Sequence, residues 1–259
     1  MSERISPCQI EKIEQVGEEA LDNIDRTYGE GYPTWTRGRH ELSYHNGHHG
    51  RAVGEAALRL CIDMELGSKE GIIAQTAGYA HDLVQLKGRG RDESESAAWL
   101  ERRLRAKDIS QRHIHMGALA IKGTEPIFQG KKIVGQKATQ LRYPDKDSEK
   151  VGLSVACGDF GELYTPQGPY LAHQLFREIK GMPDEDAIPF EDMTAFQQGQ
   201  VALLESYKYP LKRADKLLAT HKHQVIRYAQ DTLKKLEQGT IETWDDLLKR
   251  DSAFIERHT

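Results

Sequence analysis

The chain has little cysteine and no long apolar segment. Its three cysteines, Cys8, Cys61 and Cys157, lie far apart and form no C-x-x-C pair. This argues against a disulfide framework and against a cysteine-based zinc site. No apolar run approaches the roughly 18–20 residues that a helix needs to cross a bilayer, and the N-terminus lacks the features of a signal peptide. We therefore expect a cytoplasmic protein with no contact to a membrane.

An excess of charge of one sign is also lacking. The 259 residues include 40 acidic and 36 basic side chains, which give a formal net charge of −4. This composition does not require a broad basic face, so we do not expect duplex nucleic acid as a partner. The hydrophobic content of 38% and the charged content of 29% suit a folded, helix-rich protein better than a disordered one. The oligomeric state cannot be read from the sequence.

Helical periodicity dominates the sequence, and no segment shows the convincing alternation of a strand. Apolar residues recur at helical spacing and predict helices over 8–27, 48–66, 69–83, 93–106, 109–122, 148–163, 169–180, 191–207, 211–236 and 241–256. Residues 123–147 are irregular, which is typical of a lid, a substrate loop or an insertion. We predict an all-α domain over residues 1–184 and a C-terminal helical extension over 185–259, packed on the same domain.

Three histidines lie close together in the segment YHNGHH at residues 44–49, where a helix is predicted to begin. His49 shares a helical face with Val53 and Leu60, so its ring should point inward. Taken alone, each of these histidines is better explained by a structural role, as a packed core residue or as part of a polar turn that caps the helix, than by a role in function. The histidines become informative only together with polar residues elsewhere in the chain.

Two further segments place polar side chains on inward faces. His81 and Asp82 end the uncharged stretch GIIAQTAGYA, and a carboxylate at the end of a buried helix needs a cation or several hydrogen-bond donors. The small residue Gly78 should let another helix approach closely. Asp159, within SVACGDFGEL, shares a helical stripe with Val155 and also points inward.

Two imidazoles and two carboxylates on separate inward faces suit a divalent ion better than a packed core. Mixed nitrogen and oxygen ligands leave coordination positions for water and substrate, and helical bundles build metal centres in this way. The residue types do not distinguish Mn²⁺, Mg²⁺, Co²⁺, Ni²⁺, Zn²⁺ and Fe²⁺. The candidate metal ligands are His49, His81, Asp82 and Asp159.

The order H…HD…D, with the first histidine inside Y-H-N-x-x-H, resembles the HD superfamily of metal-dependent phosphohydrolases over about residues 40–175. The stretch DESESA at 92–97 also resembles a helix start found in many bacterial members. His48 offers an alternative register for the first ligand, although the four-residue spacing from His45 favours His49. The resemblance implies an all-α HD-domain bundle, in which a metal ion activates water for attack on phosphorus.

The resemblance also implies roles for further residues. The expected substrate is a phosphate ester or anhydride of a small molecule, in particular a nucleotide. His45 matches the position that protonates the leaving oxygen in cyclic-nucleotide phosphodiesterases of the superfamily, and imidazole suits that role; packing within the loop is the alternative. Asp82 is expected to orient the water or to bridge a second metal ion. The cations that could bind phosphate are Arg39, Lys87, Arg89 and Lys122.

The number of metal ions depends on additional histidines, which two-metal members use after the signature. His113 and His115 are present, but they lie near the start of a predicted helix, and the later segment IKGTEP has no histidine. We therefore expect one ion per chain. A di-iron oxygenase of the same fold is an alternative that the scarcity of later histidines weakens. A non-catalytic metal-containing binding module is another, and the complete ligand set argues against it.

Overall fold

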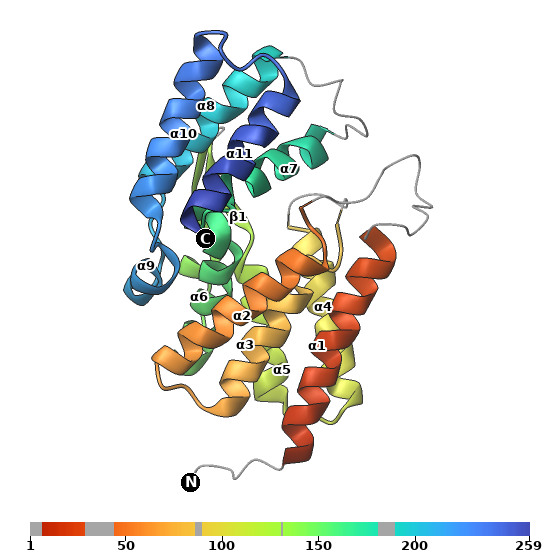
Figure 1. The fold of residues 1–259 in the computed structure, drawn as a ribbon. Helices are drawn as coiled ribbons and strands as arrows, with labels where there is room; N and C mark the ends of the chain where they lie inside the picture. The colour runs from red at the N-terminus through yellow and green to blue at the C-terminus, as the bar shows by residue number, and fades with distance from the viewer. Residues whose placement is uncertain (1–6, 29–43, 86–89, 131, 181–189) are drawn as a thin grey trace.

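The computed structural model describes residues 7–28, 44–85, 90–130, 132–180 and 190–259. Helices form nearly all of the regular structure in these ranges (Figure 1), so the predicted all-α class agrees with the structure. The N-terminal bundle consists of α1 (Pro7–Tyr28), α2 (Gly47–Asp63), α3 (Ser68–Ala80), α4 (Asp92–Ala106), α5 (Gln111–Gly123) and α6 (Lys146–Asp159). The later helices are α7 (Gly168–Lys180), α8 (Phe190–Ser206), α9 (Lys212–Leu218), α10 (Lys222–Glu237) and α11 (Trp244–His258).

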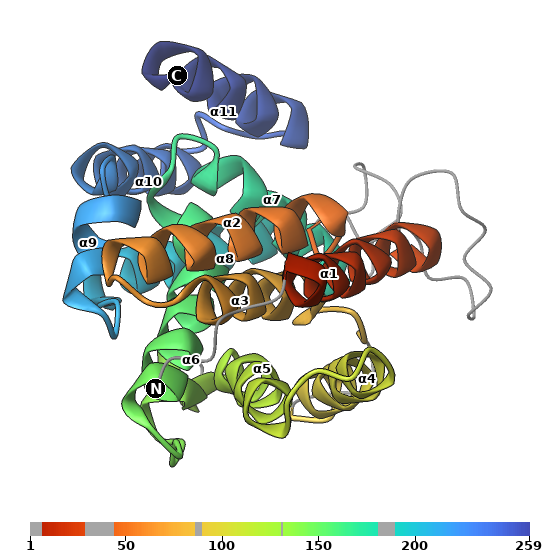
Figure 2. The ribbon, with the colours of Figure 1, turned by 90° about the horizontal axis from the view of Figure 1, so that it is seen from below.

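Helix α3 lies at the centre of the N-terminal bundle. It contacts α1, α2, α5 and α6, and Figure 2 shows α1 and α2 on one side of it and α4 and α5 on the other. Ile73, Ala74 and Ala77 of this helix are fully buried. A helix enclosed by others has to be apolar around most of its circumference, which explains the uncharged stretch before His81.

Helices α2 and α3 approach each other most closely at two glycines. A Cβ atom on Gly78 would lie 2.5 Å from the Cα of Gly54, and one on Gly54 would lie 2.6 Å from the carbonyl oxygen of Gln75. Any side chain at these positions would force the helices apart, because real Cβ contacts are never this short. The predicted close approach at Gly78 is confirmed, and it brings the beginning of α2 next to the end of α3.

The irregular segment after α5 contains a β-hairpin, so the expectation of no strand is wrong. Strand β1 (Pro126–Gln129) pairs antiparallel with β2 (Lys132–Gln136), with a bulge between Ile127 and Phe128. Gly130 begins the turn at a φ of 64°, which glycine adopts without a steric penalty. Strands of four and five residues are too short for a clear alternating pattern. A 3-10 turn, η1 (Lys137–Thr139), follows the hairpin.

The predicted single helix over 211–236 is also wrong, because the structure has two helices, α9 and α10, with a break at residues 219–221. No glycine or proline marks this break in the sequence. Tertiary contacts accompany it instead: the Lys222 ammonium lies 4.5 Å from the centre of the Tyr164 ring and donates to the carbonyl oxygen of Tyr207. Tyr164 belongs to a second 3-10 turn, η2 (Gly161–Tyr164), where the helix predicted over 148–163 is interrupted.

The later helices lie against the N-terminal bundle and share an apolar core with it. Figure 1 shows α7, α8, α10 and α11 in the upper half of the molecule, with α2 and α6 below them. Leu60 of α2 and Cys157 of α6 pack in one cluster with Leu204, Tyr207 and Val225. Through this cluster the C-terminal third reaches the end of α6. Among the described residues, no helix is long and apolar enough to cross a membrane.

Candidate metal centre

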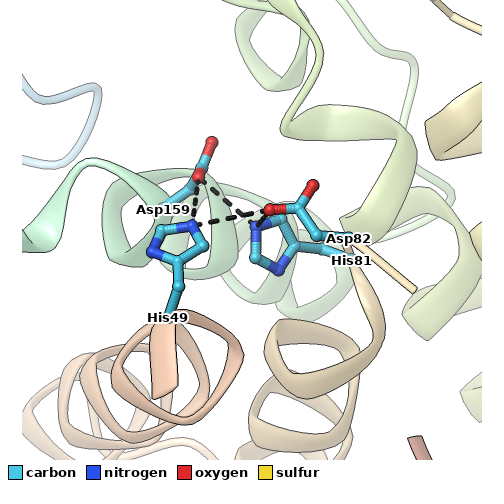
Figure 3. Close-up of side chains that lie close together, drawn as sticks. All are labelled: His49, His81, Asp82 and Asp159. Carbon is cyan, nitrogen blue, oxygen red and sulfur yellow. Dashed lines mark ion pairs between the residues drawn. The ribbon is translucent and has the colours of Figure 1, made fainter. Parts of the chain in front are cut away.

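Four of the predicted site residues meet where α2 begins and where α3 and α6 end (Figure 3). His49 lies in the first turn of α2, His81 and Asp82 directly follow α3, and Asp159 is the last residue of α6. One possible ligand atom from each lies within 4.8 Å of the other three. We call these residues the metal quartet. Within the part of the chain that the structure describes, no other group of three or more such side chains has this geometry.

Asn46 explains why His49 rather than His48 belongs to the metal quartet. The Asn46 side chain caps α2 by accepting a hydrogen bond from the backbone N–H of His49, at 3.2 Å. This cap fixes the first turn of the helix and therefore the direction of each side chain in it. His49 is buried, whereas His48 is exposed.

The two imidazoles of the metal quartet each have Nδ1 paired with an oxygen. Nδ1 of His81 donates to the carbonyl oxygen of Gly78 at 2.7 Å, and Nδ1 of His49 lies 3.3 Å from Oε2 of Glu162. Both Nε2 atoms face Oδ1 of Asp159 at 3.4 Å. Both are buried, and neither makes a hydrogen bond. Metal-binding histidines usually donate their other N–H to a carboxylate or carbonyl, so these residues fit a divalent ion.

The electrostatics of the centre favour positive charge. Helices α3 and α6 both end here, and the C-terminal end of a helix carries partial negative charge. Burial opposes the charged form of His49, but the neighbouring carboxylates of Asp159 and Glu162 raise its pKa to about 9. A cation would therefore meet a site already surrounded by negative charge. The carboxylates that surround the imidazoles are Asp82, Asp159, Glu162 and Glu178.

His45 lies beside the metal quartet and is held by Glu178 of α7. Its Nδ1 pairs with Oε1 of Glu178, while Oε2 accepts the backbone N–H groups of Tyr44 and His45 at 3.1 Å each. Its Nε2 lies 3.8 Å from Oδ2 of Asp82. Burial disfavours the protonated ring, but Asp82 and Glu178 raise the pKa of His45 above its ordinary value. The ring is clamped with Nε2 directed at the metal quartet.

The second oxygen of Asp159 is held by the hairpin. Nε2 of Gln136 donates to Oδ2 of Asp159 at 2.9 Å, and the Tyr207 hydroxyl donates to Oε1 of Gln136 at 3.0 Å. Neither residue was identified in the sequence, and neither were Glu162 and Glu178. For Glu162 a signal existed, since it stands three residues after Asp159 in DFGE. The other three are distant in sequence and carry no local signal.

The remaining predicted residues do not join the metal quartet. His113 is buried in α5, with Nδ1 2.6 Å from the Ser110 hydroxyl and Nε2 3.4 Å from Glu70, and His115 is exposed. Lys122, in the last turn of α5, is half-buried and has no ion pair with a described residue. The other three predicted phosphate-binding cations, Arg39, Lys87 and Arg89, lie outside the described residues.

No protein-family model and no curated protein sequence matches the chain. Among solved structures it is similar to Bacillus subtilis YpgQ in complex with ADP, with 14% identity and a TM-score of 0.55, over 88% of this chain and 96% of that one. A Lactobacillus plantarum protein from structural genomics has 12% identity and a TM-score of 0.53, over 91% and 98% of the two chains. These similarities concern the fold. They agree with the predicted all-α class.

Proposed function

We propose that this chain is a metal-dependent phosphohydrolase that acts on a nucleotide, cleaving a phosphate ester or anhydride bond. The observation that carries the proposal is the pair of buried, unbonded Nε2 atoms of His49 and His81, which face two carboxylates. A core would not bury two such imidazoles against two half-buried carboxylates without a compensating ligand. The choice of a nucleotide is supported by the ADP bound to B. subtilis YpgQ, which has a similar fold.

The metal quartet would hold one divalent ion, which lowers the pKa of water and offsets negative charge on phosphoryl oxygens. Asp82, whose Oδ2 lies on the side of the quartet nearest His45, would orient the attacking water. The attacking water would lose a proton to solvent. As its oxygen forms the new bond to phosphorus and the bond to the leaving oxygen breaks, His45 would give its Nε2 proton to that leaving oxygen. Glu178 keeps that nitrogen directed at the site.

The phosphate groups of the substrate require cations of the protein, because the carboxylates around the centre would repel them. Lys122 is the described candidate: it lies in the last turn of α5 and forms no ion pair with a described residue. Arg39, Lys87 and Arg89 are proposed for the same role from the sequence alone. Arginine would bind a phosphate through two parallel hydrogen bonds.

The test of this function is hydrolysis of a panel of nucleoside mono-, di- and triphosphates and cyclic nucleotides, with Mn²⁺, Mg²⁺, Co²⁺ or Ni²⁺ added to metal-stripped protein. At least one nucleotide should release phosphate or pyrophosphate, or a cyclic nucleotide should be opened. A chelator should stop the reaction. No turnover across the whole panel would contradict the proposal.

Neighbouring histidines provide a matched pair of variants for the same assay. H49A removes a quartet residue, and its loss of turnover should exceed the roughly 10–100-fold that is typical when a group behind a metal ligand is removed. H48A changes the adjacent, exposed histidine and should keep activity within about twofold. Equal losses in the two variants would show that the assignment of His49 is wrong.

A further inference from the structure

The Asp159 carboxylate is connected to the C-terminal third of the chain by a chain of two hydrogen bonds. Tyr207, directly after α8, donates to Gln136 at the end of β2, and Gln136 donates to Asp159 at the end of α6. Gln136 and Tyr207 are 2% and 4% exposed. Water therefore does not compete for these groups, and in such surroundings the hydrogen bonds are stronger than at a surface.

The direction of both hydrogen bonds is fixed by chemistry. An ionised carboxylate only accepts hydrogen bonds, so the Gln136 atom that faces Asp159 has to be its NH₂ group. The amide oxygen of Gln136 then faces Tyr207, whose hydroxyl has to donate. If that hydroxyl is removed, the amide oxygen loses its partner, and the amide is held only through its NH₂ group, by Asp159 and by the carbonyl oxygen of Thr124.

The arrangement divides the two oxygens of Asp159 between two tasks. Oδ2 is occupied by Gln136, whereas Oδ1 faces the Nε2 atoms of His49 and His81 at 3.4 Å. Such a carboxylate offers one oxygen rather than two to an ion at the metal quartet. This leaves a coordination position for water or substrate, as a catalytic metal site requires.

Tyr207 itself is held in place from several sides. Its ring stacks on Phe160, the residue after Asp159, with centroids 4.6 Å apart and planes inclined by 17°. Its carbonyl oxygen accepts hydrogen bonds from the Tyr164 hydroxyl and from the Lys222 ammonium. The hydroxyl therefore has little freedom, and the C-terminal helices decide where it lies.

We infer that Tyr207 and Gln136 are positioning residues, which set the Asp159 carboxylate for one-oxygen binding of the metal ion. The inference rests on the proposed function and adds residues from the hairpin and the C-terminal third to its metal site. Groups that bond a metal ligand from behind commonly change metal affinity by 10–100-fold when they are mutated. A merely structural role would change stability and leave metal affinity as it is.

Two tyrosines of the same cluster allow a matched comparison. Tyr207 and Tyr209 have ring centroids 5.3 Å apart and are both buried, but the Tyr209 hydroxyl donates to the carbonyl oxygen of Phe160 and not to Gln136. Y207F and Y209F each delete one buried, hydrogen-bonded hydroxyl. They differ in whether that hydroxyl leads to Asp159.

The measurement is Mn²⁺ binding to the full-length, metal-stripped chain without substrate, by titration calorimetry, with thermal unfolding recorded in parallel. We expect both variants to lower the Tm by similar amounts. Y207F should raise the Kd for Mn²⁺ about tenfold, and Y209F should change it by less than about twofold. The variant Q136M, of similar size but without a donor, should raise it by about 10–100-fold and tests the same link if Y207F does not fold.

The outcomes separate this inference from the proposed function. If the wild type binds Mn²⁺ and both Y207F and Q136M bind it as tightly as Y209F does, the inference is wrong and the proposed metal site stands. If the wild type binds none of Mn²⁺, Mg²⁺, Co²⁺, Ni²⁺ and Zn²⁺, the metal site is wrong and the inference fails with it.

Discussion

Among the described residues, two clusters of histidine and carboxylate groups differ in how many of their polar atoms have a hydrogen-bond partner within the chain. One is the metal quartet. The other, which we call the C-terminal cluster, joins His173 of α7 to Asp251 of α11: Nδ1 of His173 lies 2.6 Å from Oδ2 of Asp251, and the Tyr228 hydroxyl donates to Oδ1. Nε2 of His173 lies 3.4 Å from Oε1 of Gln197, which bonds the backbone of α10 through its other atom.

In the C-terminal cluster every nitrogen and oxygen that these side chains offer has a partner within the chain. In the metal quartet the Nε2 atoms of His49 and His81 make no hydrogen bond and face only the carboxylates of the quartet itself. No lysine or arginine among the described residues pairs with these carboxylates. A closed polar network can hold a core together, whereas an incomplete one is costly unless something else completes it. The difference indicates a structural role for the C-terminal cluster and supports the proposed metal binding at the metal quartet.

The largest expected effect is on stability, from the same substitution made in each cluster. D251A leaves His173 and Tyr228 without their acceptor in the interior, and should reduce the free energy of unfolding by about 3–5 kcal/mol. D82A leaves the imidazoles beside Asp159, Glu162 and Glu178, so it should reduce the free energy of unfolding by less than half as much. Denaturant unfolding of metal-stripped protein measures both values.

Turnover should respond in the opposite order. At a temperature where both variants are folded, D82A should lose nucleotide hydrolysis, whereas D251A should keep most of the wild-type activity per folded molecule. If D82A retains turnover, Asp82 has no part in the reaction. If D251A lowers the free energy of unfolding as little as D82A does, the two clusters do not differ in how much they contribute to stability.

The next effect is stabilisation by a metal ion. A ligand that binds only the folded state at a concentration 100 times its Kd adds about 2.7 kcal/mol to the free energy of unfolding. We expect Mn²⁺ to raise the Tm of the wild type accordingly, and to leave that of H81A unchanged. The matched control is H173A, which removes a buried histidine of the C-terminal cluster and should start from a lower Tm but show the full metal-dependent increase. An equal increase in H81A would place the ion elsewhere.

The fold could be predicted from the sequence where a helix has one continuous apolar face. In α1, Ile13, Val16 and Ile24 are buried as the spacing predicts. The prediction failed where the structure depends on contacts from elsewhere in the chain. Strands β1 and β2 are short and stabilise each other, and the break before α10 coincides with the interaction of Lys222 with Tyr164.

The candidate site shows the same division. The helical stripes predicted which side chains point inward at the ends of α2, α3 and α6, and the structure brings the metal quartet together. Three residues were missed because they are distant in the sequence from the parts of the site that they reach. Glu178 lies 96 residues after Asp82, Gln136 lies 23 residues before Asp159, and Tyr207 lies 48 residues after Asp159. Their types are common, and only the fold gives them a role.

In a third pair of histidine and carboxylate, His113 and Glu70, the cation is supplied by Arg112. A variant of this pair should give the smallest of the expected effects. Arg112 donates to Oε1 of Glu70 at 2.7 Å, and Nε2 of His113 lies 3.4 Å from the same oxygen. The neighbouring His113 imidazole, opposed by burial and assisted by Arg112, lowers the pKa of Glu70 to about 2. Here the guanidinium supplies the positive charge, so we expect no metal ion and a contribution to stability alone.

Because the folded-state pKa of Glu70 lies below the ordinary value of 4.5, its stabilisation is complete above about pH 4.5 and is lost as the pH falls towards 2. The shift would correspond to about 3 kcal/mol, and solvent screening at Arg112, whose side chain is 41% exposed, reduces this to about 1–2 kcal/mol. E70Q should therefore be destabilised at pH 7, and the difference from the wild type should shrink between pH 4.5 and 3. E256Q, at an exposed position of α11, should match the wild type throughout. A difference for E70Q that is independent of pH would mean that Glu70 stabilises by packing, and the comparison of the three clusters would then lose its electrostatic basis.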